Sequence, residues 1–251
     1  MDAPRQAPPM TATNPFLSGN FAPVEAETTC FDLGVHGRIP EGLDGRFLRI
    51  GPNPIGPVDP LRFHWFLGTG MAHGLRLRGG RAEWYRSRFV LDAKAAEALG
   101  RASIPGPGAG RRDGVVNTNF TTAGGKLYAL VEAGDLPVEL NDELECVARS
   151  DFGGTLEAGF TAHPKFEPAT GLQHAIVYQP GLPVRYLTLD VAGRASTVAR
   201  SRSLLAPVLI SPNTSRSPML TATSATPSVA MSSSTKADRK AIRSVAIAER
   251  R

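Results

Sequence analysis

Hydrophobic and polar positions alternate along short stretches between residues 45 and 200, and turn residues separate these stretches. The runs "GLRLR" (74–78) and "RAEWYRSRFV" (81–90) flank Gly79 and Gly80, an arrangement typical of a β-hairpin. The same pattern recurs three times further along the chain. It pairs 115–120 with 126–132, 160–166 with 172–178, and 184–190 with 195–201. The alternation therefore predicts an all-β fold built from successive hairpins.

One short segment breaks this pattern. "DAKAAEAL" (92–99) consists of good helix formers and leads into a Gly/Pro-rich loop at 104–114. The chain has 251 residues, with 26 Gly and 21 Pro, which suits many strands joined by tight turns. Repeated hairpins of this kind favour a β-propeller or a β-sandwich.

The C-terminal end differs from the rest of the sequence. Residues 201–251 contain no Gly, His or aromatic residue and show no sustained period, so little in them would pack on a sheet. We predict three parts: a flexible N-terminus (1–13), a folded body (14–200) and a Ser/Thr/Ala-rich tail (201–251). Two explanations of the tail stay open, a natural disordered extension and a change of reading frame near 201–212.

Charge and cysteine content argue against a nucleic-acid-binding protein and against a disulfide-rich protein. The tail holds eight basic and two acidic residues, which gives it a formal charge of +6. The whole chain has a net charge of +5, so the other 200 residues have a net charge of −1. A near-neutral body with a solvated basic end predicts no specific nucleic-acid partner. Two cysteines, Cys30 and Cys146, predict no disulfide scaffold and a cytoplasmic location. The start "MDAPRQAPPM" does not predict a secretory signal, and no apolar stretch predicts a membrane span.

Four stretches in order resemble one family: "NPFLSGNFAPV" with "GRIPEGLDGRFLRIGPNP" (14–54), "FHWFLGTGMAHGLRLRGGRAEWYRSRFV" (63–90), "NTNF" with "GKLYALVEAGDLPVEL" (117–140), and "GFTAHPKFEPATG" (159–171). They resemble the bacterial carotenoid cleavage oxygenases, the retinal pigment epithelial membrane protein family. The resemblance implies a seven-bladed β-propeller with axial Fe(II) that cleaves a C=C bond of a carotenoid, apocarotenoid or stilbene with O2. It covers the N-terminal portion only, so the fold expected here is an incomplete propeller, with the first blades alone.

The same resemblance assigns two site residues. Four histidines bind the iron in that family, and His163 in "TAHPK" matches the first of them. Glu132 in "KLYALVE" matches an acid that accepts a hydrogen bond from a ligand histidine, which we expect to be one of the later histidines. The chain has five histidines and none follows residue 174, so the other three ligands have no counterpart.

Several other residues invite a functional interpretation. If the third hairpin turns at 168–169, His174 faces His163 and the two could chelate a metal, although packing is the preferred role for His174. His73 fits a buried histidine bonded to the backbone. Trp65, Phe66 and Trp84 could stack on a polyene, but we expect them to pack in the core.

These observations leave two classes of function. By family the chain is an Fe(II)-dependent oxygenase, and we expect the truncated chain itself to be inactive because three of four ligands are absent. The alternative is a non-catalytic partial propeller, either an interaction module that binds a partner, a copy of itself or a lipid surface through open sheet edges, or a non-functional truncated product. The oligomeric state stays open.

Overall fold

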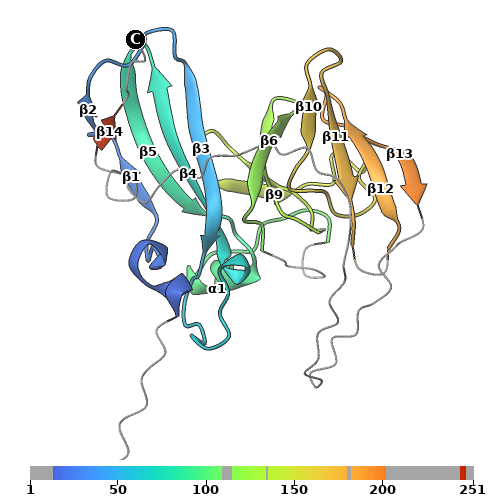
Figure 1. Ribbon diagram of the computed structural model, residues 1–251, viewed down its shortest axis with the longest axis horizontal. Coiled ribbons are helices and arrows are strands. Elements are labelled where there is room, and N and C mark those ends of the chain that lie inside the picture. Colours follow the sequence, from blue (N-terminus) through green and yellow to red (C-terminus); the bar gives the residue numbers. More distant parts are fainter. Residues whose placement is uncertain (1–13, 109–114, 134, 180–181, 202–243, 247–251) are drawn as a thin grey trace, which may run out of the picture.

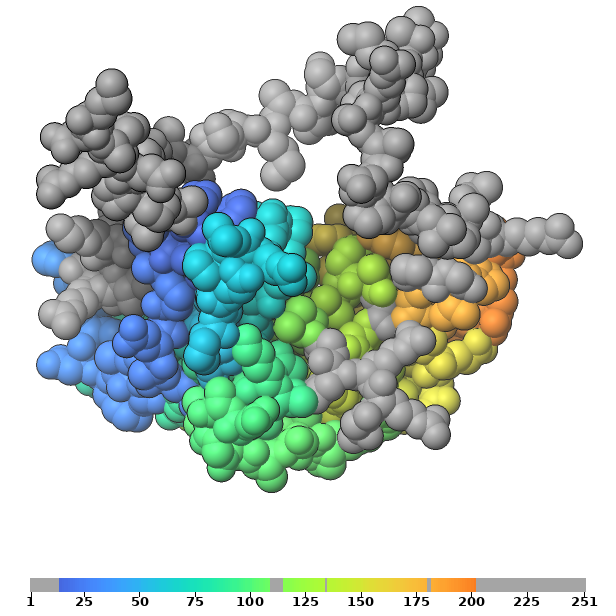
Figure 2. All heavy atoms as spheres, turned by 90° about the horizontal axis from the view of Figure 1, so that it is seen from below, coloured from blue at the N-terminus to red at the C-terminus, as the bar shows by residue number. Residues whose placement is uncertain are grey.

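Three four-stranded antiparallel sheets stand side by side in the computed structural model (Figure 1), which describes residues 14–108, 115–133, 135–179, 182–201 and the backbone of 244–246. We call them blades 1 to 3. They follow one another across the molecule in chain order (Figure 2). Blade 1 has the strand order β1-β5-β4-β3, and blades 2 and 3 have the orders β6-β7-β8-β9 and β10-β11-β12-β13. This architecture is the expected partial propeller.

The strands are short, as the hairpin pattern predicts. Blade 1 contains β1 (Thr28–Cys30), β3 (Gly45–Asn53), β4 (Thr69–Arg78) and β5 (Arg81–Phe89). Blade 2 contains β6 (Asn119–Ala123), β7 (Lys126–Leu130), β8 (Val138–Leu140) and β9 (Cys146–Arg149). Blade 3 contains β10 (Lys165–Glu167), β11 (Leu172–Val177), β12 (Val184–Leu189) and β13 (Ala195–Ser201). The single-turn 3-10 helices η1 (Pro15–Leu17), η2 (Gly19–Phe21) and η3 (Trp65–Leu67) lie before and within blade 1.

The hairpin between β4 and β5 confirms the first prediction. Gly79 and Gly80 both have positive φ, +52° and +75°, which a two-residue turn of this hand requires and which glycine adopts without strain. In blade 2 the first strand begins later than predicted, at Asn119 instead of residue 115. The side chain of Asn117 donates to the carbonyls of Phe66 and Gly68 at 3.1 and 2.8 Å, which holds this segment against blade 1.

The predicted helix forms α1 (Ala93–Ala98) between blades 1 and 2. Asp92 caps it, because its Oδ1 accepts from the backbone N–H of Ala95 at 2.8 Å. Gly100, with φ +62°, follows its last turn. Over the described residues no helix has the length and apolarity needed to cross a membrane.

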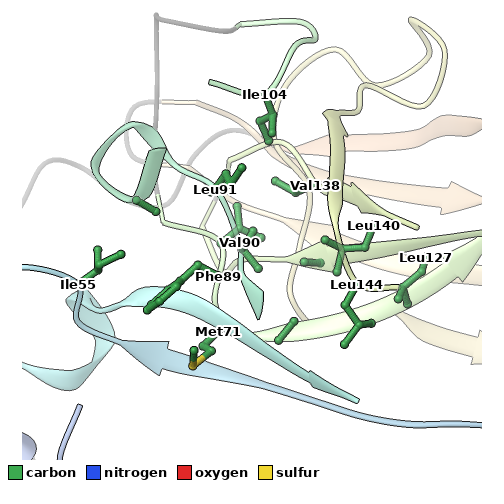
Figure 3. Packing of buried hydrophobic residues seen from close by; sticks show 14 of the residues in the cluster. Ile55, Met71, Phe89, Val90, Leu91, Ile104, Leu127, Val138, Leu140 and Leu144 are labelled. Carbon is green, nitrogen blue, oxygen red and sulfur yellow. The ribbon is translucent and has the colours of Figure 1, made fainter. Parts of the chain in front are cut away.

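The hydrophobic core lies between blades, not within one. One cluster fills the space between blades 1 and 2, and it includes Met71 and Phe89 from blade 1 and Leu140 and Leu144 from blade 2 (Figure 3). A second cluster packs blade 2 on blade 3. Strand β7 contributes to both, because side chains alternate across a strand: Leu127 and Ala129 face blade 1, and Tyr128 and Leu130 face blade 3.

The register of the β10–β11 hairpin corrects one prediction. The turn takes four residues, 168–171, and the closing pair is Glu167 with Leu172, because Gly171 at φ +74° donates back to the carbonyl of Glu167. His174 consequently pairs with Lys165, two residues beyond His163. His163 lies before the strand begins, so the two histidines are not opposed.

Two further expectations are wrong in part. Trp84 is in the core at 8% exposure, but Trp65 and Phe66 are 37% and 66% exposed. Both lie in η3, a single turn outside the sheets, where Trp65 stacks on Phe66 with ring centroids 5.3 Å apart. His73 bonds a side chain instead of the backbone, since its Nδ1 is 2.8 Å from the Tyr85 hydroxyl.

Three residues of the tail belong to a described element. β14 (Ser244–Ala246) pairs in parallel with β2 (Gly34–His36) in a separate two-stranded sheet beside blade 1. The remainder of the predicted tail, beyond Ser201, lies outside the described residues, as does the predicted flexible segment 1–13.

Candidate functional site

His163 lies at the start of blade 3, two residues before β10. Buried neighbours and a hydrogen bond from blade 2 fix the backbone of the segment that carries it. Thr161 and Ala162 are buried, and Asn119, the first residue of β6, donates from its side-chain amide to the carbonyl of Ala162 at 2.9 Å. Pro164 restricts the backbone of His163 to an extended conformation. The backbone is therefore anchored while the imidazole is 60% exposed.

Glu132 reaches the same place from blade 2. It follows β7 by two residues, on the side of Tyr128 and Leu130, as strand alternation predicts. Its Oε2 lies 3.1 Å from Nε2 of His163. Oε2 is buried and receives no hydrogen bond of good geometry, so the two atoms are close without an aligned N–H. The structure thus brings both predicted site residues together, with Glu132 beside His163.

Tyr178 is a third member of this group, and the sequence analysis did not single it out. A hydrogen bond with the Glu132 carboxylate raises the pKa of Tyr178, and burial raises it further. The carboxylate of Glu132 therefore stands between an imidazole and a phenol. The one signal for Tyr178 is its position just past β11, on the strand face that also carries His174 and Ile176.

These side chains line one pocket of about 340 Å³ at the edge of blade 3. Its walls combine polar and apolar residues: Glu132, Thr161, His163, Lys165, His174, Ala175, Ile176, Tyr178 and Tyr186.

His174 belongs to this pocket, but its ring nitrogens are engaged. Nδ1 is 2.6 Å from the Tyr186 hydroxyl, and Nε2 is 3.3 Å from Oε2 of Glu167. The rings of His174 and Tyr186 stack with centroids 5.9 Å apart. His174 therefore has the packing role that the sequence analysis preferred.

The donor set can be compared with the iron site that the resemblance implies. Four neutral imidazoles suit Fe(II) and leave positions for O2. Of the two imidazoles in the pocket, that of His163 is the better placed for a metal, and its Nε2 faces a carboxylate. Across the part of the chain that the structure describes, no three His, Cys, Asp or Glu residues gather closely enough to hold a metal ion. The described residues do not form an iron centre by themselves.

Comparison with known proteins identifies the relatives of this fold and site. The family model described as retinal pigment epithelial membrane protein matches residues 21–227. A carotenoid cleavage oxygenase of Mycobacterium tuberculosis is 49% identical over 186 residues, which are 72% of this chain and 37% of that protein. An isoeugenol monooxygenase of Pseudomonas nitroreducens is 36% identical over 178 residues, 64% of this chain and 36% of that protein.

Solved structures agree with the sequence comparisons. The lignostilbene dioxygenase of Pseudomonas brassicacearum superposes with a TM-score of 0.63 at 30% identity, over 76% of this chain and 42% of that one. The chain spans well under half the length of these relatives, and its three blades correspond to the first part of a seven-bladed propeller. Because the family model matches most of this chain, the chain belongs to the carotenoid cleavage oxygenase family, that of the retinal pigment epithelial membrane protein.

Proposed function

We propose that this chain supplies the first three blades, and one metal-binding histidine, of an oxygenase that uses O2 to cleave a C=C bond of a carotenoid, apocarotenoid or stilbene. The observation that carries the proposal is the meeting of His163 and Glu132 in one pocket, 3.1 Å apart, although they come from different blades. The names of the relatives support the substrate classes, since they include a carotenoid cleavage oxygenase and a lignostilbene dioxygenase.

The two residues have distinct roles in this proposal. His163 offers a neutral imidazole nitrogen to Fe(II), the metal that would activate O2 for the cleavage. Glu132 orients a ligand imidazole by accepting a hydrogen bond from its ring N–H, which fixes the tautomer and raises the basicity of the other ring nitrogen. Tyr178 in turn donates to Glu132 and holds the carboxylate in place.

The chain alone is proposed to be catalytically inactive. One exposed imidazole does not bind Fe(II) tightly, and in this structure a carboxylate lies against the nitrogen that the metal needs. Further imidazoles would have to reach the pocket from another polypeptide segment. A location in the cytoplasm, predicted from cysteine content, is part of the same proposal.

Metal content and turnover test this directly. The chain is purified after expression in iron-supplemented medium, its iron is measured by mass spectrometry, and it is assayed with an apocarotenoid and a stilbene under air. We expect far less than one iron per chain and no cleavage product. Stoichiometric iron with product formation, both lost in His163→Ala but kept in His174→Ala, would show that the chain is active by itself.

An interaction module is the second candidate, because large apolar side chains of blade 3 are exposed among the described residues. Ile176 is 55% exposed and Tyr178 37%, and Leu182, in the connection before β12, is 39% exposed. A stable, protease-resistant and monodisperse chain without iron supports a binding role. A chain that aggregates and is cut throughout blade 3 supports the remaining alternative, a non-functional product.

A further inference from the structure

Two histidine–tyrosine pairs with the same geometry occur in this chain, one in blade 1 and one in blade 3. Tyr85 follows His73 by 12 residues, and Tyr186 follows His174 by 12. In each pair the histidine Nδ1 lies close to the tyrosine hydroxyl, at 2.8 Å in blade 1 and 2.6 Å in blade 3. The two rings also stack, with centroids 6.2 Å and 5.9 Å apart. The fold therefore repeats one arrangement, and the pairs differ in their surroundings.

Strand register brings each pair together. In blade 3, Tyr186 on β12 stands opposite Ile176 on β11, two residues along the strand from His174. Residues two apart lie on the same face of a strand, and such diagonal neighbours are within reach of aromatic side chains. The same diagonal relation holds between β4 and β5 in blade 1. Hairpin pairing alone thus explains the contact in both blades, so a special role must come from what differs.

A carboxylate distinguishes the pair in blade 3. Oε2 of Glu167, the last residue of β10, lies 3.3 Å from Nε2 of His174. A hydrogen bond from Thr170, and a further one from His174, lower the pKa of Glu167, so this carboxylate is ionised at neutral pH and can only accept. In the neutral ring of His174, Nε2 then carries the proton and Nδ1 accepts from the Tyr186 hydroxyl. The order of groups is a phenol, an imidazole and an anion.

Blade 1 surrounds its histidine with the opposite charge. The residue directly opposed to His73 on β3 is Arg49. Burial, and after it the charge of Arg49, lowers the pKa of His73, which disfavours a second proton on that ring. In blade 3, Glu167 is instead placed to form an ion pair with a protonated His174.

The other two tyrosines of the chain have weaker bases as partners. Tyr128 bonds the hydroxyl of Ser150, and Tyr178 bonds the carboxylate of Glu132. A hydroxyl is not a base at neutral pH, and an unperturbed imidazole is more basic than a carboxylate by about two pKa units. Of the four tyrosines in the sequence, Tyr186 therefore has the strongest arrangement for giving up its proton.

We propose that Tyr186 is a redox-active residue, which a one-electron oxidant converts to a neutral tyrosyl radical while its proton moves to His174. The O–H bond of Tyr186 breaks, the electron goes to the oxidant, and Nδ1 of His174 binds the proton. Glu167 pairs with the imidazolium that forms. A phenol that has lost an electron is strongly acidic, so oxidation is easiest where a base already lies within hydrogen-bond reach. A one-electron reductant reverses the step, and the proton returns to the phenol oxygen.

The position of the pair gives this oxidation a use. Tyr186 and His174 line the same pocket as His163 and Glu132. A phenol loses an electron more readily than an imidazole does, so an oxidant that enters the pocket reacts with Tyr186 and leaves His163 intact. The inference goes beyond the proposed function and does not rest on it, because it requires neither iron nor cleavage of a substrate.

The test uses the full chain without added iron. A ruthenium(III) polypyridyl complex, generated by a light flash with a sacrificial electron acceptor, is the oxidant, and the radical is measured by transient absorption and electron paramagnetic resonance. Ring-deuterated tyrosine, incorporated during expression, narrows the resonance of a tyrosyl radical and separates it from a radical on Trp65 or Trp84. We expect a tyrosyl signal that Tyr186→Phe removes. We also expect it to form more slowly in heavy water, because the proton leaves together with the electron.

Matched substitutions separate the base from the hydrogen bond. His174→Gln keeps a group that can accept a hydrogen bond but is not a base, and is expected to remove most of the signal. His73→Gln makes the same change in blade 1 and is expected to leave the signal as in the parent chain. Glu167→Gln removes the anion and is expected to reduce the signal. Circular dichroism of each variant shows whether the blades are intact.

The yield of the tyrosyl radical decides the outcome. A signal that Tyr186→Phe leaves at the parent level overturns the proposal, and so does a radical found on tryptophan alone. An unchanged yield in His174→Gln or in Glu167→Gln, or equal losses in His174→Gln and His73→Gln, also overturns it. Loss of the signal in Tyr186→Phe and His174→Gln with its retention in His73→Gln upholds the proposal, whatever the iron content and turnover of the chain prove to be.

Discussion

Replacing Gly70 by alanine is expected to force blade 1 away from the segment that leads into blade 2. A Cβ at position 70 would lie 1.9 Å from the carbonyl oxygen of Val116 and 2.9 Å from its carbonyl carbon. Real Cβ contacts essentially never fall below 3.0 Å, so the shortfall is about 1.1 Å against backbone, which cannot rotate away as a side chain can. Gly70 itself is held, because its carbonyl accepts from the N–H of Val90 at 2.7 Å.

The magnitude follows from two opposing effects. Overpacking of a close-packed interior costs about 1–3 kcal/mol, and a clash with backbone belongs at the upper end. Alanine in a strand recovers about 0.5–1 kcal/mol of backbone entropy relative to glycine. The net loss of unfolding free energy is therefore about 2 kcal/mol, which at an m-value of about 2 kcal/mol/M lowers the urea midpoint by about 1 M.

Urea unfolding followed by tryptophan fluorescence measures this loss, because Trp84 is in the core and 8% exposed. Gly45→Ala is the matched control: Gly45 lies in β3, has no positive φ, and has nothing within 4 Å of the position that an added methyl carbon would take. Its midpoint is expected to stay within error or rise slightly. Equal midpoints for the two variants would refute the reasoning.

Three further predictions concern single side chains. Asp92→Ala removes the acceptor for the Ala95 N–H at the start of α1 and is expected to cost about 1 kcal/mol of unfolding free energy in the same urea assay. Burial, with a smaller effect of Arg49, lowers the pKa of His73 below 6.5, so the stability that its neutral form contributes is present above pH 6.5 and is lost as the pH falls. The urea midpoint should therefore drop between pH 7.5 and pH 5.5, and His73→Gln should make this drop smaller. An equal drop in the variant would contradict the argument. Burial raises the pKa of the Cys146 thiol to about 11, so iodoacetamide at pH 8 should label Cys146 slowly in the folded chain and rapidly in urea, as peptide mass spectrometry would show.

Much of the fold follows from local pattern. The Gly79-Gly80 turn needs positive φ at both positions, and the alternation on either side fixes which residues face the core, so this hairpin could be predicted from the letters alone. The helix at Ala93–Ala98 follows in the same way from its Asp92 cap. The start of β6 could not be predicted, because it depends on long-range hydrogen bonds from Asn117 to Phe66 and Gly68.

In the candidate site, too, local sequence pattern predicts some features, and others depend on long-range packing. Motif resemblance found His163 and Glu132, and alternation placed Glu132 on the correct face of β7. The contact between them depends on how blades 2 and 3 pack, which no local pattern encodes. His163 and His174 would face each other only with a turn at 168–169, and the four-residue turn ending at Gly171 shifts the register by two. Asn119, which anchors Ala162, has no local signal beyond its polar side chain at the head of a strand.

The position of β7 has a consequence for how the blades influence each other. Blade 1 and blade 3 contribute to different core clusters, and β7 takes part in both, with Leu127 and Ala129 in one and Tyr128 and Leu130 in the other. We therefore expect a change in packing at the first interface to affect the second through this strand, as in a linear array with nearest-neighbour coupling. Because Glu132 follows β7 by two residues, we expect the distance between its carboxylate and His163 to change when the packing on the opposite face of the sheet is altered.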